Sequence, residues 1–567
     1  MEQWDHSVDV VVVGSGNGGL TAALSCYESG TEDVLVLEKH HQFGGTSALS
    51  GGGIWIPNNH YAIAAGANDS PEEAREYLRQ TIPEGLVPDD LLDTYLREAP
   101  NMLRFLHDNT QVRYQSLAEY PDYYSHLPGA KEGHRSLEPQ VLNISDLGDE
   151  WKNLHPAHIM MYVFGKFTIT QKETWLIVGK NPGWKRLILK RFASWFFDFG
   201  WRLKSPHSRR IVNGQAGVAR LILSMQDRDL PLWRNCALQE LITDSDNRVI
   251  GLIANHEGKI LRIHARKGVI LAAGGFEHNQ TMREQYLPPP TNREWSSGIE
   301  TNTGDAIRAA QAIGAQTQQM SGAWWCTTIS FPGEIQPRLS ITDKSLPGNC
   351  VVNKNGMRIG NESQNYMAYQ QAWLASHSED APAVPAWMVF DANYRSKYKL
   401  GPMMDGKLRP DHTLPREWLD SGFLTISNTV EELAEKTGID AIGLKSTLDA
   451  MTGYAETGKD LDFRRGDSAY DRYYGDSAVQ PNPCLAPINK PPFYAVRVQP
   501  GDFGTQGGLQ LNRHAQVLNH EQEPIPGLYA TGNCTAAILP TYPGPGSTLG
   551  PAMAFGYLAG RHVCDKS

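Results

Sequence analysis

Paired cysteines, excess basic charge and long apolar runs are what this sequence lacks. Its seven cysteines contain no CxxC pair, which argues against a zinc knuckle, any other metal site of that kind, and a disulfide framework. With 52 Lys and Arg against 62 Asp and Glu, the net charge of −10 gives no general affinity for nucleic acid. No uncharged apolar run approaches the ~20 residues of a transmembrane helix. Residues 1–8 contain Glu2 and Asp5 where an export signal would be basic and then apolar, so we expect a cytoplasmic protein.

Core material, in contrast, is ample. At 567 residues with a hydrophobic share of 40%, the chain exceeds what one core usually serves, so we expect two domains. The charged share of 20% is ordinary for a globular protein, which excludes a disordered chain, and no internal repeat is visible.

The N-terminal pattern is that of a dinucleotide-binding unit. Val8 to Val13 is a β-branched run typical of a parallel strand that is buried on both faces. It leads into GSGNGG, from Gly14 to Gly19, and a predicted helix from Leu20 to Glu28. In such a unit Gly14 permits the tight turn, Gly16 lets the backbone approach a pyrophosphate, and Gly19 allows the helix to pack on the strand.

The next strand adds an acidic end to this unit. Val34 to Leu37 is followed by Glu38, at the place where a carboxylate would accept the ribose hydroxyls of the cofactor. An acidic residue here argues against a 2′-phosphate, so the pattern favours FAD or NAD over NADP.

Three glycine-rich segments favour FAD. The turn that opens Gly44 to Asn59 (GGTSALSGGGIWIPNN) resembles the loop with which flavoproteins of the succinate dehydrogenase and fumarate reductase superfamily cover the flavin. Gly268 to Phe276 and Gly527 to Asn533 are similar to segments that this superfamily returns to the FAD site. No histidine or cysteine is identifiable as a flavin attachment point, so the resemblance implies non-covalent FAD. It would be bound by Gly14, Ser15, Gly16, Gly18, Gly19, Glu38, Lys39, Gly44, Gly45, Thr46, Ser47, Gly51, Gly52, Gly53, Ala273, Gly274, Gly532, Asn533 and Leu549.

The fold class that we predict is α/β, a Rossmann-like FAD-binding domain with an inserted α+β catalytic domain that caps the substrate. The first domain would comprise residues 1–325 and 494–567, and the second residues 326–493. Alternation around two polar turns predicts a small antiparallel meander from Leu241 to Ala265.

Motifs along almost the whole chain resemble the bacterial 3-ketosteroid Δ1-dehydrogenases. The early GIWIP and late TYPGPG motifs are the specific ones, because many flavoproteins share the glycine fingerprint. The matching segments are Gly44 to Asn59, PDYY (121–124), SLPG (345–348), NES with Tyr366 (361–366), SAYDRYYGD (468–476), PGDFGTQGG (500–508) and TYPGPGSTLGPAM (541–553).

The resemblance implies a reaction and the residues that perform it. In that family a 3-ketosteroid loses a proton from C2 and a hydride from C1, and the hydride passes to flavin N5. Tyr542 and the backbone N–H of Gly546 would donate hydrogen bonds to the C3 carbonyl oxygen, and Tyr366 would be the general base. Tyr123 would assist Tyr366, with Tyr120 and Tyr124 as close competitors. An external acceptor, a quinone or another oxidant, would take the electrons.

These residue types suit such chemistry. Two neutral donors aimed at one oxygen stabilise a developing enolate. A tyrosine, with a reference pKa of ~10, is a poor base in water and needs help from a neighbouring hydroxyl, positive potential or hydride departure. The sequence departs from the family pattern at Pro540, where histidine is frequent, and at Asn17, where alanine or glycine is usual. Neither change removes a catalytic group, but Pro540 puts the rate or the substrate preference in doubt.

Residues 151–210 form an extra stretch relative to shorter members of the family. From Lys180 to Arg210 the sequence has nine basic residues and one acidic residue, Asp198, although the chain is acidic overall. Seven apolar residues recur at helical spacing and would line one face of a helix: Trp184, Leu187, Ile188, Phe192, Trp195, Phe196 and Phe199. Lys185, Arg186, Lys190 and Arg202 would border this face. Such a helix suits a membrane surface, placing the protein on the inner face of the cell membrane, but a core helix or an oligomer contact stays open.

Three other functions stay open at this point. A 3-ketosteroid Δ4-dehydrogenase uses the same ketone and flavin. A fumarate reductase would need cationic groups for a dicarboxylate, and Arg358 is near Tyr366 in the sequence. A catalytically silent flavin-binding protein at the membrane would have no reason to bring Tyr123, Tyr366 and Tyr542 together.

Overall fold

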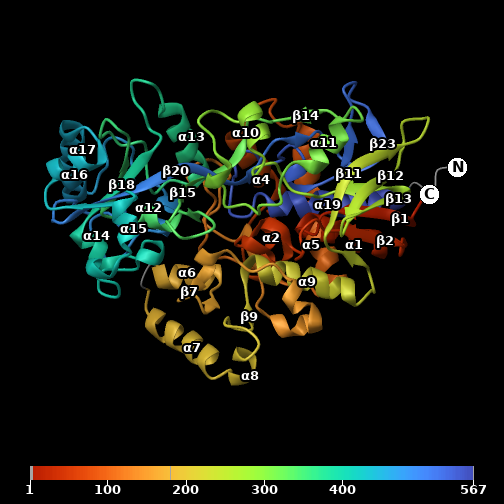
Figure 1. Ribbon diagram of the computed structural model, residues 1–567, viewed down its shortest axis with the longest axis horizontal. Helices are drawn as coiled ribbons and strands as arrows, with labels where there is room; N and C mark the ends of the chain where they lie inside the picture. Colours follow the sequence, from red (N-terminus) through yellow and green to blue (C-terminus); the bar gives the residue numbers. More distant parts are fainter. Residues whose placement is uncertain (1–3, 179–180, 566–567) are drawn as a thin grey trace.

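The computed structural model of the protein describes residues 4–178 and 181–565 and contains two main sheets (Figure 1). Glu2 of the predicted N-terminal pattern and Lys180 of the predicted basic stretch lie outside the described residues. The first sheet, at the right of Figure 1, has the strand order β10-β2-β1-β13-β12-β11, with β23 on β13 and β22 on β23. Its strands are β1 (His6–Val13), β2 (Val34–Leu37), β10 (Leu232–Trp233), β11 (Cys236–Thr243), β12 (Val249–His256), β13 (Lys259–Leu271), β22 (Gln516–Leu518) and β23 (Pro524–Ala530).

The dinucleotide-binding unit predicted from the sequence forms the centre of this sheet. β1 lies between β2 and β13 and is parallel to both, so Val10, Val11 and Val12 have no exposed surface. The helix that follows, α1 (Asn17–Glu28), packs on α9 (Asn213–Gln226) and on the C-terminal α19 (Leu549–Asp565). The predicted meander is present, because β11, β12 and β13 pair antiparallel in sequence order.

The segment between β2 and β10 surrounds this centre. Helix α5 (Asp89–Asn109) packs on α19, and the short strands β3 (Ile54–Trp55), β5 (Ser136–Pro139) and β4 (Tyr114–Ser116) form a separate small sheet. Apart from α9 and the elements of the lobe described below, this segment also contains α2 (Gly45–Leu49), α3 (His60–Ala64), α4 (Pro71–Thr81), β6 (Leu142–Asn143), η1 (Ile144–Asn153) and β9 (Arg210–Ile211).

The second sheet is antiparallel, with the order β16-β15-β20-β18-β17 and β19 on β20. Its side chains alternate between two cores, because successive residues of a strand point to opposite faces. Met388 and Phe390 of β18 pack with α13, α14 and α15, whereas Trp387 and Val389 pack with α16 and α17. The elements are β15 (Ala323–Ile329), β16 (Arg338–Leu339), α12 (Thr342–Ser345), β17 (Asn349–Val352), α13 (Tyr366–Ser376), β18 (Ala386–Asp391), α14 (Ala392–Lys397), α15 (Arg416–Asp420), β19 (Leu424–Ser427), α16 (Val430–Thr437), α17 (Ala441–Thr457), α18 (Ala469–Tyr473) and β20 (Phe493–Thr505).

Strand β20 extends the second sheet past the predicted domain boundary at residue 493. It pairs with β18 from Phe493 to Val498 and then with β15, where Thr505 lies opposite Ala323. Beyond these two residues, β14 (Thr317–Gln318) pairs with β21 (Gly508–Leu509), and α10 (Gln280–Tyr286) and α11 (Asp305–Gln311) follow β13. The chain therefore enters and leaves the second sheet through adjacent, paired strands.

The extra stretch forms a lobe that projects from the rest of the molecule, at the bottom of Figure 1. It contains η2 (Ile159–Met161), β7 (Tyr162–Val163), β8 (Phe167–Thr168), α6 (Gln171–Val178), α7 (Trp184–Phe196) and α8 (Phe199–Arg202). The predicted single helix is wrong, because the chain breaks after Phe196 and Asp198, bound by Arg209, precedes α8. Of the apolar residues predicted to line one face, Trp195 is buried, whereas Phe192, Phe196 and Phe199 are exposed.

Candidate active site

One large cavity lies between the first sheet and the part of the second sheet that contains Leu339 of β16 and Phe503 of β20. Val13, Leu37 and Ala272 mark its floor, at the carboxyl ends of β1, β2 and β13, which is where parallel sheets bind ligands. The cavity continues from the glycine turn of β1 to Tyr123, Tyr366 and Tyr542. A cofactor and a substrate can therefore meet in one space.

Nearly all the residues predicted to bind the cofactor line this cavity. The exceptions are Gly19 and Gly44. Gly19 packs against the strand turn, where a Cβ would lie 2.1 Å from the Gly14 carbonyl oxygen, and the Gly44 N–H donates to Ser15 Oγ at 2.9 Å. Those that line it are Gly14, Ser15, Gly16, Gly18, Glu38, Lys39, Gly45, Thr46, Ser47, Gly51, Gly52, Gly53, Ala273, Gly274, Gly532, Asn533 and Leu549.

The glycine turn after β1 is tightly packed and leads directly into α1. Gly14 has φ +112°, and a Cβ there would lie 2.2 Å from the Ala272 carbonyl oxygen, so only glycine is accommodated. Asn17 follows at the N-terminus of α1, where its backbone N–H donates to Ser47 Oγ at 3.1 Å and its buried side-chain Oδ1 has no hydrogen-bond partner among the described residues. Backbone N–H groups at a helix N-terminus favour an anion, as the pyrophosphate of FAD would supply.

Two charged side chains after β2 border the same part of the cavity. Glu38 is buried and accepts hydrogen bonds from Ser15 Oγ, the Ser15 N–H and the His40 N–H. Its burial raises the pKa of the carboxyl group, and these hydrogen bonds act in the opposite direction. Lys39 Nζ donates to Asp305 at 2.6 Å and Thr303 at 2.7 Å, which fixes this lysine beside the cavity.

The three tyrosines singled out from the sequence meet at the other part of the cavity. Ring centroids are 5.3 Å apart for Tyr123 and Tyr366, 5.4 Å for Tyr366 and Tyr542, and 5.5 Å for Tyr123 and Tyr542. They come from three separate segments, since Tyr366 is the first residue of α13 and the other two lie in loops. The Tyr123 N–H donates to the Pro543 carbonyl at 2.9 Å, which joins the PDYY and TYPGPG motifs directly.

The loop that carries Tyr542 has an unusual backbone. Tyr542 adopts φ +58°, a conformation that non-glycine residues seldom take and that is concentrated at functional sites. Gly546 has φ +102°, and a Cβ there would lie 2.5 Å from backbone atoms of Gly53 and Ile54. The Gly546 backbone is close enough to the Tyr542 hydroxyl to act on its pKa, in the lowering direction, so the two predicted donors lie beside each other.

All three phenols are buried and neutral in this environment. Burial raises the pKa of Tyr123 and of Tyr366 well above the ordinary value, and also raises that of Tyr542. A hydrogen bond between Tyr123 and Tyr366 acts in the opposite direction on Tyr366. A neutral Tyr542 can donate a hydrogen bond, whereas Tyr366 must first lose a proton to act as a base.

The competing tyrosines of the PDYY region have other partners. Tyr124 donates to the Thr541 carbonyl at 2.8 Å, and Tyr120, which lines the cavity, is 2.8 Å from the Tyr474 hydroxyl. Pro540, the departure from the family pattern, accepts from Gln506 Nε2 at 2.6 Å through its carbonyl oxygen.

Several residues in the lining of the cavity, or packed directly behind it, were not identified from the sequence. Tyr470 lies in the SAYDRYYGD motif, and its ring is 4.7 Å from that of Tyr123. Phe503 lies in PGDFGTQGG, 5.7 Å from Tyr366, so the motifs were noticed but not their aromatic side chains. Gln171 and Glu138, joined by a hydrogen bond of 2.6 Å from the Gln171 N–H, had no signal in the sequence.

The charge of the cavity argues against a dicarboxylate substrate. Within residues 4–178 and 181–565, no arginine lines it, and its lysine, Lys39, is held by Asp305. Arg358, which kept the fumarate reductase alternative open, is paired with Glu362 and Asp460 and does not reach the cavity. The cationic groups that a dicarboxylate requires are therefore missing from the described lining.

Comparisons with known proteins agree with this geometry. Residues 9–549 match the family model described as "FAD binding domain". The 3-oxosteroid 1-dehydrogenase of Mycolicibacterium smegmatis is 38% identical over 98% of this chain and 97% of its own. The 3-ketosteroid delta1-dehydrogenase of Sterolibacterium denitrificans, solved in complex with 1,4-androstadiene-3,17-dione, matches with a TM-score of 0.95 and 44% identity over 99% of this chain and 100% of that one. The 4-oxocyclohexanecarboxylate 2-dehydrogenase of Sinomonas cyclohexanicum is 36% identical over 99% of this chain and 93% of its own.

Proposed function

The chain belongs to the FAD-binding flavoprotein family that includes the 3-oxosteroid 1-dehydrogenases, and we propose that it desaturates the C1–C2 bond of 3-ketosteroids. The observation that carries this proposal is the meeting of Tyr123, Tyr366 and Tyr542 in the cavity that also contains the FAD-binding glycines. FAD, when bound, supplies the acceptor for the hydride that leaves C1.

Tyr542 and Gly546 bind the ketone. The Tyr542 hydroxyl and the Gly546 N–H converge, so both can donate to the C3 oxygen. Negative charge develops on that oxygen when C2 loses a proton, and two fixed neutral donors stabilise it without reorganisation. This interaction strengthens as the reaction proceeds, which is the condition for acceleration.

Tyr366 receives the proton from C2. Its partner Tyr123 donates a hydrogen bond that favours the phenolate of Tyr366, and Tyr470 lies directly beside Tyr123. Phe503 and the other aromatic rings around Tyr366 keep water from the reacting carbon. The two electrons then pass to an external acceptor, a quinone or another oxidant.

The remainder of the cavity suits a large neutral ring system better than a small acid. The described lining offers no arginine for a carboxylate. Besides the tyrosines it contains these apolar side chains: Leu117, Leu137, Met160, Met161, Leu339 and Ile341. A 4-oxocyclohexanecarboxylate would leave its charge unpaired there, at a substantial desolvation cost.

Anaerobic mixing with androst-4-ene-3,17-dione tests the proposed function. We expect the flavin absorbance to bleach and the 1,4-diene to form, because the substrate loses a proton and a hydride to the enzyme. 4-Oxocyclohexanecarboxylate, the matched control, should leave the flavin oxidised. A flavin bleached only by the small acid would overturn the steroid assignment. Bleaching only by a saturated 3-ketosteroid, with a 4-ene product, would indicate Δ4-dehydrogenation instead.

A further part of the proposal places the enzyme on the inner face of the cell membrane. The lobe exposes six apolar side chains on α7, α8 and the residues beside them, with exposed fractions from 39% to 91%, which we call the apolar patch: Leu189, Phe192, Phe196, Phe197, Phe199 and Leu203. The rings of its four phenylalanines contact one another. Exposed Lys185, Arg186, Lys190 and Lys204 lie on the same two helices and their ends. Aromatic side chains bordered by basic ones match an anionic bilayer. Among the described residues, each helix is either too short or too polar to span a bilayer.

The lobe also reaches the active site. Met160, Met161 and Gln171, at the start of the extra stretch, line the cavity, and α6 packs on α7. A patch held in the bilayer would therefore be connected through α6 to the wall of the substrate cavity, which suits a substrate dissolved in lipid.

Co-sedimentation with phosphatidylglycerol vesicles tests this contact. Changing Phe196, Phe197 and Leu203 together to serine should lower vesicle binding by at least about tenfold, since full burial of one such side chain is worth about 1.5–3 kcal/mol. The matched control changes exposed Ile335, Ile442 and Leu461 to serine and should bind as the parent does. Equal binding by both triple variants, or no preference for phosphatidylglycerol over phosphatidylcholine, would count against a membrane contact.

A further inference from the structure

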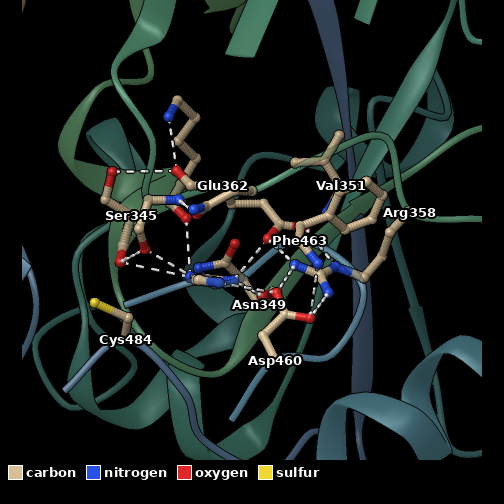
Figure 2. Close-up of polar contacts among 12 residues, drawn as sticks. Ser345, Asn349, Val351, Arg358, Glu362, Asp460, Phe463 and Cys484 are labelled. Carbon is tan, nitrogen blue, oxygen red and sulfur yellow. Dashed lines mark hydrogen bonds and ion pairs between the residues drawn. The ribbon is translucent and has the colours of Figure 1, made fainter. Parts of the chain in front are cut away.

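A buried network of charged side chains lies in the second domain, outside the cavity (Figure 2). Glu362 is its centre. Arg358 Nη2 donates to Glu362 Oε2 at 2.7 Å, and Arg465 Nη1 donates to the same oxygen at 3.0 Å. Arg358 also binds Asp460 through both carboxylate oxygens, at 2.9 and 3.0 Å. The side chains of these four residues are at most 3% exposed.

The network fixes the segment that leads into Tyr366. Glu362 is four residues before Tyr366, and its Oε1 accepts the Val351 N–H of β17 at 3.1 Å. Buried Lys344 donates to the Glu362 carbonyl at 2.6 Å and to the Gln364 carbonyl at 3.0 Å. The turn before α13 is therefore held by its side chain and by its backbone.

Arg465 joins this turn to the SLPG loop. Its guanidinium donates to the Leu346 and Asn349 carbonyls, both at 2.8 Å, while its Nε donates to Ser363 Oγ at 3.0 Å. The donors of one planar guanidinium are thus distributed over both segments.

A second branch leads to Tyr470. Asn361 Nδ2 donates to Asp471 Oδ2 at 2.9 Å, and the Gly466 N–H, next to Arg465, donates to the same oxygen at 2.9 Å. Asp471 follows Tyr470 in α18, and the Tyr470 ring packs on Tyr123. One connected set of contacts thus reaches both Tyr366 and Tyr470, which packs on Tyr123.

We propose that Glu362 and Arg465 are positioning residues, which hold Tyr366 at the distance from C2 that proton transfer requires. A buried ion network adds little stability compared with apolar packing, whereas it fixes geometry at several points at once. Proton transfer in turn depends steeply on the placement of the base. This inference rests on the proposed function, because it concerns the same reaction.

Stopped-flow reduction of the flavin by androst-4-ene-3,17-dione tests the proposal with Glu362→Gln, which retains the shape of the side chain and removes its charge. We expect the rate constant to fall by about 10- to 10²-fold, the cost of a small misplacement of a reacting group. The isotope effect with C2-deuterated steroid should increase, because proton transfer becomes the slower event. A merely structural role would lower the flavin content or the amplitude, not change the isotope effect.

A double variant decides whether the effect passes through Tyr366. Glu362→Gln should slow flavin reduction little in a Tyr366→Phe background, because the base that it positions is already absent. An equal loss in both backgrounds, or an unchanged rate constant in Glu362→Gln, would overturn the proposal. Asn361→Ala serves if Glu362→Gln fails to fold: it removes the hydrogen bond to Asp471 and the two that Asn361 Oδ1 accepts from the Ser363 and Gln364 N–H groups, and it should show the same increase in isotope effect. Asp411→Asn, at the ion pair with Arg395 in the same domain, is the matched control. If the parent flavin stays oxidised with the steroid, the proposed function fails instead.

Discussion

Replacement of Tyr542 by phenylalanine is expected to slow flavin reduction by the steroid about 10²- to 10³-fold, the usual cost of one lost donor at a developing oxyanion. Burial keeps the Tyr542 phenol neutral, so in the parent it remains a donor at all working pH values. The variant keeps the ring contacts with Tyr123 and Tyr366 and loses only the hydroxyl. Stopped-flow absorbance at saturating steroid measures the effect, which should fall on the rate constant more than on steroid binding.

Tyr529→Phe is the control for this experiment. Tyr529 lies in β23, where its hydroxyl contacts His562 at 3.0 Å, remote from the three tyrosines of the cavity. Its loss should leave flavin reduction unchanged. A parent-like rate constant in Tyr542→Phe would assign the ketone to other donors.

Tyr366→Phe is expected to slow the same reaction by about 10²- to 10⁴-fold, the range that general bases contribute. Since burial raises the pKa of Tyr366 well above its ordinary value, only a small fraction is phenolate at neutral pH. The fraction grows as pH rises, so the rate constant of the parent should increase with pH above neutrality. The variant should lose that increase. Flavin reduction followed by stopped flow across a pH series measures both effects.

Tyr369→Phe is a control on the same helix. Tyr369 is buried one turn further along α13, and its hydroxyl has no hydrogen-bond partner in the part of the chain that the structure describes. Removing it should therefore change neither the rate constant nor its pH dependence. A pH profile that survives in Tyr366→Phe would show that another group takes the proton.

The sequence was most informative where a local pattern determines the structure. The run from Val8 to Val13 has one stable place, the buried centre of a parallel sheet, and the glycines after it fit only a tight turn near a phosphate. The meander before Leu271 was equally predictable, because alternation and polar turns specify antiparallel pairing.

Contacts between distant segments were not predictable in this way. Tyr470 and Phe503 lie in motifs that were recognised, but nothing local shows that their rings meet Tyr123 and Tyr366. Arg358 was considered for a dicarboxylate because it is near Tyr366 in the chain, whereas folding turns it towards Glu362 and Asp460. Periodicity predicted one helix from Trp184 to Phe199, and it could not show the break before α8.

The paired strands β15 and β20 bear on how such enzymes diversify. The chain departs for the second domain at Ala323 and returns at Thr505, and these residues lie opposite each other in the ladder. Because the two crossings are neighbours, both covalent connections of the intervening residues to the rest of the chain lie at a single place. In evolutionary terms, the intervening module can change its length and its loops while the glycine turns that bind FAD keep their positions.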